Sequence, residues 1–579
     1  MTNQEIAHIL YNISEYLAME DVEFKPRAYE KAAMSIEALD KSVFDIYKAG
    51  GTKALEKLPA IGFGIAQKIK ELFETGKIKE YEQLKKKIPV NLEELTAVAG
   101  VGPKSILKLY KTLRIKNVKD LEKAIKEKKI RNIEGFGQKS EENMLISIQF
   151  LKNSNSRFPL GYVLYDLRRI EERIKKLKGV KKTLLGGSIR RMKETVGDAD
   201  ILVSVSNPKI QADIINYFIN MPEVAHIYSH GKTKSSVRLK NHIQFDLRVV
   251  PEKSFGAAAQ YFTGSKDHNI ALRKIAIKKG LKLNEYGLFS LKSEARISKS
   301  ETEEEVYKIL GLKWMEPELR ENTGEIELAR QNKLPKIIGY NDIKGDLQVH
   351  STWSDGQNTI EEMAKKAIAM GLEYIAITDH LRGTLDNQIS EKDLLRQWEE
   401  IDKLNAGYKK RGIKFRILKS GEVEILNNGK LFMRDEILKK FDIVGAAIHS
   451  YAKLTKEQMT ELYIKVMKNP NVDMIFHPTG RLIGLRPARE MDMEKIIQTA
   501  KETKTVLEID AYYDRLDLKD EYLRMAKKAG VKIAIDSDAH STSHLQFLEL
   551  GIAQARRAWL AKEDVINAWP VEKMLKMLK

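Results

Sequence analysis

The spacing of apolar residues changes twice along the chain. Before about residue 150, apolar side chains recur at helical intervals, as in Ile6, Ile9, Leu10, Ile13 and Leu17. This spacing predicts amphipathic helices. From about residue 151 to 255, apolar and polar residues alternate as in half-buried strands. After residue 340, short apolar runs such as YIAIT, FDIVGAAI and TVLEIDA alternate with helical segments, which predicts a parallel β/α barrel.

One strand of the middle region carries paired acidic residues. The segment GGSIRRMKETVGDAD spans residues 186–200, and Asp198 and Asp200 lie two residues apart, which places both carboxylates on one face of a strand. The alternating strand QFDLRVV adds Asp246 as a third carboxylate. Oxygen ligands suit Mg²⁺ or Mn²⁺, and a Gly-Ser turn offers N–H groups to a phosphate. We therefore expect metal-assisted transfer of a phosphoryl or nucleotidyl group.

The helical region contains a repeated Gly-x-Gly turn between amphipathic helices. Three copies occur, at Gly62 and Gly64, Gly100 and Gly102, and Gly135 and Gly137. Glycine lets the backbone approach a ligand closely, and the following helix start attracts an anion. This is the helix-hairpin-helix pattern, which holds a DNA phosphate without reading sequence. A single copy is also an ordinary helix–helix turn, but three copies in a basic chain favour DNA binding.

Charge and composition narrow the class of protein. The 579 residues carry a formal net charge of +19, which favours a polyanionic partner. Because there are no cysteines, disulfides, thiolate catalysis and Cys-zinc sites are excluded. No apolar run is long enough to span a bilayer, and the N-terminus lacks the pattern of a signal peptide. We therefore expect no membrane association and a cytoplasmic, nucleoid-associated location.

Possible metal ligands end the apolar runs of the C-terminal half. They are His350, His380, His449 and His477, with Asp538 and His540 after the last run. Active-site residues of β/α barrels lie at the C-terminal ends of the strands. Imidazoles and carboxylates that meet there suit Mn²⁺, Zn²⁺ or Fe²⁺. A lone histidine is more often a core residue, but the repeated position predicts a second metal centre.

Residues 1 to about 330 resemble the family X DNA polymerases, the DNA polymerase beta-like enzymes. The matching segments are GGSIRR…GDADIL, FDLR, YFTGS and LNEYGLF. The resemblance implies that Asp198, Asp200 and Asp246 bind two ions, Mg²⁺ or Mn²⁺. It implies contacts to the incoming nucleotide from Arg157, Gly187, Ser188, Arg191, Tyr261, Phe262, Gly264 and Asn269. Arg248 and Arg273 then lie on the DNA side. Lys266 departs from the family, which has an acidic residue there.

The N-terminal segment FKPRAYEKAA resembles the family's 5′-phosphate-binding region, with Lys25 and Tyr29 in the matching positions. Lys68 matches the family's Schiff-base lysine, and a lysine with a lowered pKa can act as such a nucleophile. Gly64 replaces another basic residue of that pocket. The resemblance therefore leaves two roles for Lys68, a lyase nucleophile or a phosphate contact.

Residues from about 340 to 575 resemble the PHP domain, the polymerase-and-histidinol-phosphatase family of metal phosphoesterases. The matches are DLQVHSTWSDG, AITDH, GEVEI, IHS, HPTGR and SDAH. The resemblance implies a distorted seven-stranded barrel with up to three ions, Mn²⁺ or Zn²⁺, and removal of 3′ nucleotides. The implied ligands are Gln348, His350, Asp355, His380, Glu422, His449, His477, Asp538 and His540. Gln348 departs from the family, which usually has histidine there.

These observations predict a multidomain α/β enzyme. We expect an N-terminal helical, lyase-like domain over 1–85, a helix-hairpin-helix fingers-type domain over 86–150, a palm over 151–255, a thumb-type domain over 256–316, a linker over 317–339 and a PHP domain over 340–579. The leading function is gap-filling DNA repair synthesis with Mn-dependent 3′–5′ exonuclease activity, and 3′-phosphatase or abasic-site cleavage belongs to the same chemistry. The expected partners are gapped or nicked DNA and deoxynucleoside triphosphates, bound by a monomer.

Two other classes of function stay open. An RNA-end nucleotidyltransferase shares the Gly-Ser and Asp-x-Asp core, with the barrel then acting on a small-molecule phosphate. A non-catalytic DNA scaffold is the other alternative. The three helix-hairpin-helix copies and YFTGS argue against the first, and the intact carboxylate and histidine sets argue against the second.

Overall fold

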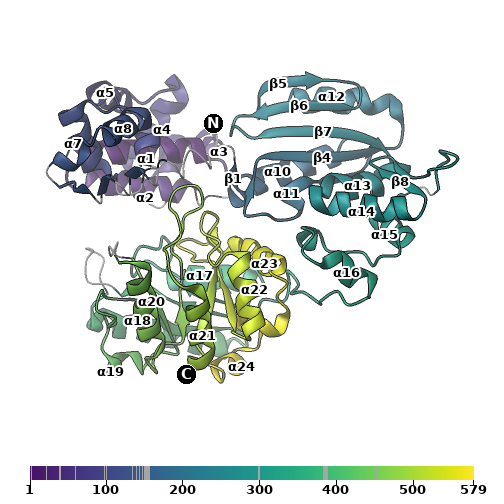
Figure 1. The fold of residues 1–579 in the computed structure, drawn as a ribbon. Coiled ribbons are helices and arrows are strands. Elements are labelled where there is room, and N and C mark those ends of the chain that lie inside the picture. Colours follow the sequence, from purple (N-terminus) through teal and green to yellow (C-terminus); the bar gives the residue numbers. More distant parts are fainter. Residues whose placement is uncertain are drawn as a thin grey trace.

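Residues 1–148 form a helical lobe with its own apolar core (Figure 1). The computed structural model describes the chain apart from residues 2, 21, 38, 40, 59, 97, 99, 100, 134, 139, 142, 143, 146, 147, 149–156, 298, 299, 382–388 and 450–453. The helices whose bounds are described in this lobe include α1 (Asn3–Met19), α2 (Lys25–Glu37), α3 (Val43–Leu55), α4 (Phe63–Thr75), α5 (Lys79–Lys87), α6 (Leu92–Thr96), α7 (Pro103–Leu113) and α8 (Val118–Lys126). Their buried positions follow the helical spacing of the sequence, for example Ile6, Leu10 and Ile13 on α1.

The palm is a mixed five-stranded sheet with helices packed on it. Its strand order is β2-β4-β7-β6-β5, and only β4 and β7 are parallel. The strands are β2 (Val180–Leu185), β4 (Asp198–Val205), β5 (Val224–His230), β6 (Lys234–Leu239) and β7 (Gln244–Pro251). Helices α10 (Leu160–Lys175) and α12 (Gln211–Ile219) contribute to the same apolar core. A short pair, β1 (Phe158–Pro159) with β3 (Thr195–Val196), lies beside the sheet.

The thumb follows the palm and is built on a smaller apolar core. It contains α13 (Phe255–Thr263), α14 (Lys266–Lys278), the hairpin β8 (Leu281–Asn284) with β9 (Gly287–Ser290), and α15 (Glu303–Leu310). Residues 317–339, where we expected a linker, contain the 3-10 turn η4 (Pro317–Leu319) and α16 (Glu325–Arg330). Arg320 is fully buried there and pairs with Glu303 at 2.6 Å. This segment therefore folds onto the thumb.

The C-terminal lobe is a nearly closed parallel barrel, which confirms the predicted fold class. Seven strands lie in the order β10-β11-β13-β14-β15-β16-β17, and a parallel bridge joins Val349 to Ala539 where the barrel closes. The strands are β10 (Gly345–Val349), β11 (Tyr374–Ile377), β13 (Arg416–Glu424), β14 (Ile443–Ala447), β15 (Met474–Ile475), β16 (Val506–Asp510) and β17 (Ile533–Asp536). The short β12 (His380–Leu381) pairs with β13. The outer helices are α17 (Ile360–Ala369), α18 (Glu391–Lys410), α20 (Lys456–Met467), α21 (Met493–Thr503), α22 (Asp520–Ala529) and α23 (Leu548–Arg557).

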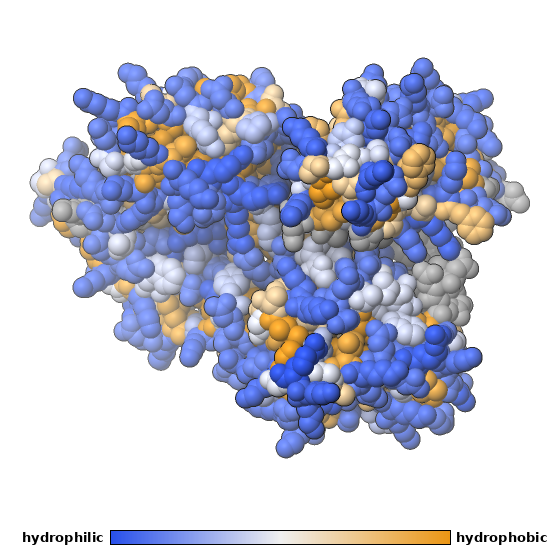
Figure 2. Space-filling model, turned by 180° about the vertical axis from the view of Figure 1, so that it is seen from behind, coloured by the Kyte–Doolittle hydropathy of each residue, from blue (hydrophilic) through white to orange (hydrophobic). Residues whose placement is uncertain are grey.

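Palm and barrel share buried apolar contacts. Phe547, Leu550 and Ala553, at the start of and on α23, belong to the same buried cluster as the palm helix α10. Arg168 of α10 also forms a two-bond ion pair with Glu549. The surface seen in Figure 2 is mainly hydrophilic, with small apolar patches. Among the helices that the structure describes, none has the length and apolar character to cross a membrane.

Candidate active sites

Three carboxylates lie together at one end of the palm sheet. Asp198 and Asp200 are on β4, and strand pairing sets Asp200 directly opposite Asp246 of β7. Burial, followed by the charges of Asp198 and Asp246, raises the pKa of Asp200 to about 6. The Asp246 carboxylate accepts hydrogen bonds from Ser236 at 2.5 Å and Gln244 at 3.0 Å, and Lys234 lies 3.4 Å away. Neighbouring carboxylates of this kind suit divalent cations with oxygen ligands.

The Gly-Gly-Ser turn before β4 comes close to these carboxylates. Gly187 has a φ of +62°, and a Cβ there would lie 3.3 Å from an Asp200 oxygen, so glycine permits both the backbone conformation and the close approach. Ser188 follows in the short helix α11 (Gly187–Arg190). Arg191 ends that helix, and its guanidinium donates to Glu321 at 3.0 Å and to the carbonyl of Thr263. The turn therefore joins the palm to the thumb.

The other residues that we expected to contact the nucleotide or the DNA come from α13, α14 and the strands. Asn269 donates to the carbonyl of Tyr261 at 2.7 Å, which ties the YFTGS segment to α14. Arg248 lies over the Phe262 ring at 4.4 Å, a cation–π contact. Gly264 has a φ of +72° at the end of α13, and a Cβ there would meet the Arg191 guanidinium at 2.9 Å. Arg273 is exposed on α14. Arg157 lies apart from these contacts. Its guanidinium donates hydrogen bonds to the Thr195 carbonyl at 2.7 Å and to the Thr195 hydroxyl at 3.0 Å.

The hairpin glycines lie at exposed turns of the helical lobe. Gly62 and Gly102 are the N-cap residues of α4 and α7. A Cβ at Gly62, Gly64, Gly102 or Gly137 would have no atom within 4 Å among the described residues, so these backbones are open to a ligand. Gly135 has a φ of +83°, with the Lys108 ammonium 3.8 Å from its Cβ position. Gly100 lies outside the described residues.

The lysines and tyrosine that resemble a 5′-phosphate pocket gather on one carboxylate. Glu80 accepts a hydrogen bond from Tyr29 at 3.0 Å and lies 3.3 Å from the Lys68 ammonium and 4.0 Å from that of Lys25. Lys68 is also 3.8 Å from Glu71. Burial and the Glu80 charge raise the pKa of the Tyr29 phenol. The structure thus brings the three residues together, around an acidic side chain that the sequence analysis did not single out.

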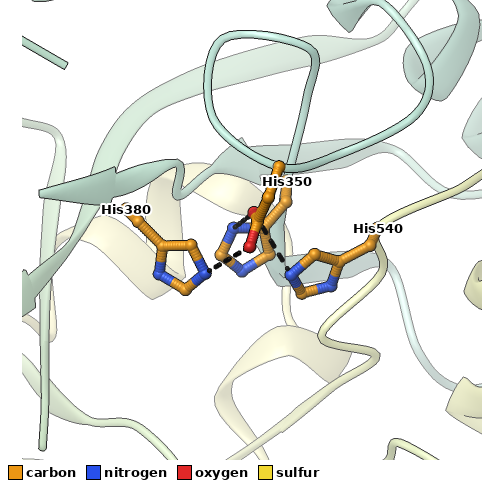
Figure 3. Close-up of side chains that lie close together, drawn as sticks. His350, His380 and His540 are labelled. Atoms are coloured by element: carbon orange, nitrogen blue, oxygen red, sulfur yellow. Dashed lines mark ion pairs between the residues drawn. The ribbon is translucent and has the colours of Figure 1, made fainter. Parts of the chain in front are cut away.

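The histidines of the barrel converge at the C-terminal ends of its strands. Asp355 lies 3.2 Å from His380 and 3.5 Å from His540, and His350 lies 3.1 Å from Asp538. Figure 3 shows the imidazoles of His350, His380 and His540 facing a common point. Among the described residues, two groups of three or more candidate ligands have their ligand atoms within 4.8 Å of one another, and both are in the barrel. The palm carboxylates are not among them.

Glu422 is at the centre of the histidine cluster. Its carboxylate lies 2.7 Å from His380, 2.9 Å from His449 and 2.7 Å from His477. Burial opposes its charge, but the imidazoles of His449 and His380 hold the pKa of Glu422 well below its usual range. Burial lowers the pKa of His380, but the carboxylates of Glu422 and Asp355 outweigh burial and raise this pKa to about 10. A divalent cation bound here would therefore displace protons from the imidazoles.

Gln348 shows that this chain's own residues fit a metal. Its side chain is fully buried, and neither amide atom has a hydrogen-bond partner among the described residues. A buried amide without a partner is costly, and a cation would satisfy the oxygen. His477 and Asp538 have positive φ angles of 27° and 50°, a strained backbone of the kind that functional sites retain. The ligand set of imidazole, carboxylate and amide suits Mn²⁺ or Zn²⁺.

Family models match four parts of the chain. A helix-hairpin-helix domain matches residues 1–78, a SAM-like helix-hairpin-helix tandem 92–149, a DNA polymerase beta thumb 258–321 and a PHP domain 346–546. A protein named DNA polymerase/3′-5′ exonuclease PolX, from Bacillus subtilis strain 168, is 36% identical over 583 residues, covering 100% of both chains. The chain belongs to the family X DNA polymerases that carry a PHP domain. It is an enzyme of that class, which joins DNA polymerase to 3′–5′ exonuclease.

Two further relatives match the barrel alone. A probable phosphatase of Acetivibrio thermocellus is 34% identical over 207 residues, covering 34% of this chain and 78% of the relative. A probable phosphatase of Thermoanaerobacter sp. strain X514 is 32% identical over 234 residues, covering 38% of this chain and 89% of the relative. The PHP barrel of this family X polymerase therefore also resembles proteins that match no other part of the chain.

The barrel contains polar residues that the sequence analysis missed. Glu424 accepts from His449 Nδ1 at 2.5 Å, and its spacing of two from Glu422 on one strand was an available signal. Arg515 lies 3.3 Å from Asp510 and 3.6 Å from the expected ligand Asp538. No motif pointed to Arg515, which lies in the turn after β16 and contacts Asp538 beyond the end of β17.

Proposed function

We propose that this enzyme fills short gaps in DNA and trims the 3′ ends at which it works. The observation that supports this best is the presence of two separate polar centres in one chain. The palm holds three carboxylates beside a Gly-Ser turn, and the barrel holds five histidines around Glu422 and Asp355. The first suits nucleotidyl transfer, and the second suits hydrolysis of a phosphodiester.

Each centre has its own set of candidate metal ligands. Asp198, Asp200 and Asp246 would hold two Mg²⁺ or Mn²⁺ ions, with Ser188 and Arg191 on the triphosphate. The histidines, Glu422, Asp355, Asp538 and Gln348 would hold up to three ions, with Mn²⁺ favoured over Zn²⁺ for nuclease activity. Bound divalent ions supply Lewis acidity and neutralise the charge that develops on phosphate oxygens. The protein's own residues orient the substrate, and the imidazoles of His449 and His380 hold the Glu422 carboxylate in its charged form.

The substrate is gapped or nicked duplex DNA. The exposed hairpin turns before α4 and α7 leave room for a phosphate at the helix N-termini, and the net charge of +19 favours a polyanion. Because each centre is complete within one chain, the proposed acting unit is a monomer. A DNA substrate also suits a place at the nucleoid.

A 5′-labelled duplex with a short gap tests both activities together. Wild type, Asp198→Ala and His350→Ala are each incubated with Mg²⁺ or Mn²⁺, with and without deoxynucleoside triphosphates. We expect Asp198→Ala to lose extension by at least 100-fold and to retain Mn²⁺-dependent 3′ shortening. We expect His350→Ala to show the reverse. Unchanged incorporation by Asp198→Ala would exclude the palm as the polymerase site, and unchanged shortening by His350→Ala would exclude the barrel as the nuclease.

The helical lobe supports a second candidate activity, removal of a 5′-deoxyribose phosphate. Lys25, Tyr29 and Lys68 meet within 4.0 Å of the Glu80 carboxylate, in the positions that resemble the family's lyase pocket. If Lys68 forms a Schiff base, borohydride will trap the protein on an incised abasic-site duplex. Lys68→Ala should lose the trapped product, whereas Lys70→Ala, which alters the Glu74 pair on the same helix, should retain it. Equal trapping by both variants would remove Lys68 from this role.

The barrel-only relatives raise a third candidate, a small phosphomonoester as the barrel's substrate. Hydrolysis of p-nitrophenyl phosphate is compared with shortening of single-stranded DNA under Mn²⁺. We expect DNA to be preferred by at least 100-fold in kcat/KM. The opposite preference would assign the barrel to small phosphates. Tailing of an RNA end in place of gapped DNA would assign the palm to RNA.

A further inference from the structure

Arg191 is held by a network that reaches from the palm into the barrel. Its side chain is 11% exposed, and it donates from Nε to Glu321 at 3.0 Å and from Nη1 to the carbonyl of Thr263. Glu321 is the last residue of the segment that matches the thumb model, 130 residues along the chain from Arg191. The guanidinium is thus fixed at two of its nitrogens before any nucleotide binds.

Arg557 of the barrel helix α23 contacts both partners of that ion pair. Its Nη1 donates to Glu321 at 3.1 Å and to the Arg191 carbonyl at 3.2 Å, and its Nη2 donates to Asp520 at 2.8 Å. Arg557 is 4% exposed. Burial opposes the Glu321 charge, but Arg191 and Arg557 together hold the pKa of Glu321 below its usual range. The Glu321 carboxylate therefore accepts hydrogen bonds from two arginines, Arg191 and Arg557, that belong to different domains.

The next residues of the palm turn are also tied to the barrel. Glu194 pairs with Arg481 at 2.8 Å, and Arg481 lies four residues after His477. The carbonyl of Glu194 in turn accepts from the backbone of Leu160 at 2.9 Å. The loop from Arg191 to Glu194, between the Gly-Ser turn and the catalytic strand β4, thus lies against the barrel at both ends.

We propose that the barrel sets the nucleotide affinity of the palm, because Arg557 shares the Glu321 carboxylate with Arg191 and so keeps Arg191 placed and available for the triphosphate. The inference rests on the proposed role of Arg191 as a triphosphate contact. Without Arg557, Glu321 has Arg191 as its nearest full-charge partner, since Lys193 is 4.0 Å away. The Arg191–Glu321 ion pair then competes with the nucleotide for the Arg191 guanidinium. Arg557 and Glu321 are positioning residues.

Steady-state incorporation on gapped DNA tests this proposal in the full-length enzyme. Arg557→Ala should raise KM for the deoxynucleoside triphosphate about 3- to 10-fold, the range that ordering one flexible side chain represents, with kcat within twofold of wild type. Arg191→Ala is the reference and should raise KM at least as far. Arg168→Ala removes the α10–α23 ion pair with Glu549 without touching this network, and it should leave KM within twofold.

A second substitution separates positioning from simple loosening of the interface. Adding Glu321→Gln to Arg557→Ala should lower KM again, because a neutral amide no longer sequesters Arg191. If Arg557→Ala only damaged the interface, removal of the Glu321 charge as well would not lower KM again. Shortening of single-stranded DNA by Arg557→Ala, within twofold of wild type, checks that the barrel is folded.

The outcomes distinguish this inference from the function on which it rests. If Arg191→Ala leaves KM unchanged, the proposed triphosphate role of Arg191 fails. If Arg191→Ala raises KM but Arg557→Ala changes it no more than Arg168→Ala does, the triphosphate role stands and the barrel's influence is refuted. A KM in the double variant above that of Arg557→Ala would also overturn the sharing mechanism.

Discussion

Asp200 illustrates how a buried carboxyl beside other acidic residues lowers the stability of the fold. Burial and the nearby charges of Asp198 and Asp246 raise its pKa to about 6, from an ordinary value of 3.8. A carboxyl whose folded pKa is raised binds its proton more tightly in the native state. Stability is therefore lost as pH rises from about 4 to about 6, and above that range the loss is constant. A bound cation opposes this effect because it stabilises the charged form.

Asp200→Asn should accordingly stabilise the metal-free protein at pH 7. The pKa shift corresponds to roughly 1–3 kcal/mol in the free energy of unfolding, and the gain should vanish at pH 4, where the wild-type carboxyl is protonated as well. Addition of Mg²⁺ should raise the unfolding temperature of wild type more than that of Asp200→Asn. Thermal unfolding at both pH values, with and without Mg²⁺, checks this. A destabilised variant in metal-free buffer at pH 7 would contradict the expectation.

The residues that carried a local signal in the sequence are ones that the structure places close together. The spacing of Asp198 and Asp200, and histidines at the ends of apolar runs, pointed to groups that the structure brings together. Contacts between distant segments left no such signal. Glu80 beside Lys68, and Arg557 beside Glu321, became visible only in three dimensions, because an exposed and a buried charge look the same in a sequence.

Glycine has a different role at each end of helix α4. Gly62 at its start has an ordinary φ of −81° and no atom within 4 Å of its Cβ position. Gly76 at its end has a φ of +73°, which an L-residue adopts only at a cost. Glycine is required at position 76 because of the backbone conformation. At position 62 it would be required only by a ligand that comes close to the backbone.

Gly62→Ala should therefore weaken DNA binding without changing stability. A methyl group that blocks one hydrogen bond to a phosphate costs about tenfold in affinity. Gly76→Ala is the matched control, and it should lose about 1 kcal/mol of stability with DNA affinity unchanged. Fluorescence anisotropy with a gapped duplex and thermal unfolding give the two readouts. Equal DNA affinity for Gly62→Ala and wild type would remove this turn from the DNA interface.

At the level of elements, apolar runs predicted the barrel well. Six of them fall on strands β11 and β13–β17, because each run is buried on both faces, as in any parallel sheet. Residues 317–339 were harder, because we expected a linker there. Arg320 is nevertheless fully buried there, since Glu303 and the Met315 carbonyl satisfy its guanidinium. Whether a charged side chain is buried in such a segment depends on its pairing with other groups, which hydropathy does not report.

The whole molecule contains more than one buried apolar core. The helical lobe closes its own apolar core between Ile6 and Ile148. Palm and barrel instead share a cluster in which Phe547 and Leu550 pack with the residues of α10, and the Arg168–Glu549 pair joins the same helices. Elements that share a buried core unfold together. We therefore expect two transitions in calorimetry, one for the helical lobe and one for the palm with the barrel.

Gly161 on α10 offers a test of this division. Alanine is ordinarily the better helix residue, by up to about 1 kcal/mol. However, a Cβ at Gly161 would lie 2.5 Å from the Tyr513 Cβ and 2.7 Å from the Leu550 Cδ1, and such overpacking costs about 1–3 kcal/mol. The overlap outweighs the helix preference, so Gly161→Ala should lower the palm–barrel transition by about 2–5 °C and leave the helical-lobe transition in place. Gly62→Ala, which meets no neighbour, should move neither transition. A single transition in wild type, or an equal shift of both transitions in Gly161→Ala, would show that the lobes unfold as one unit.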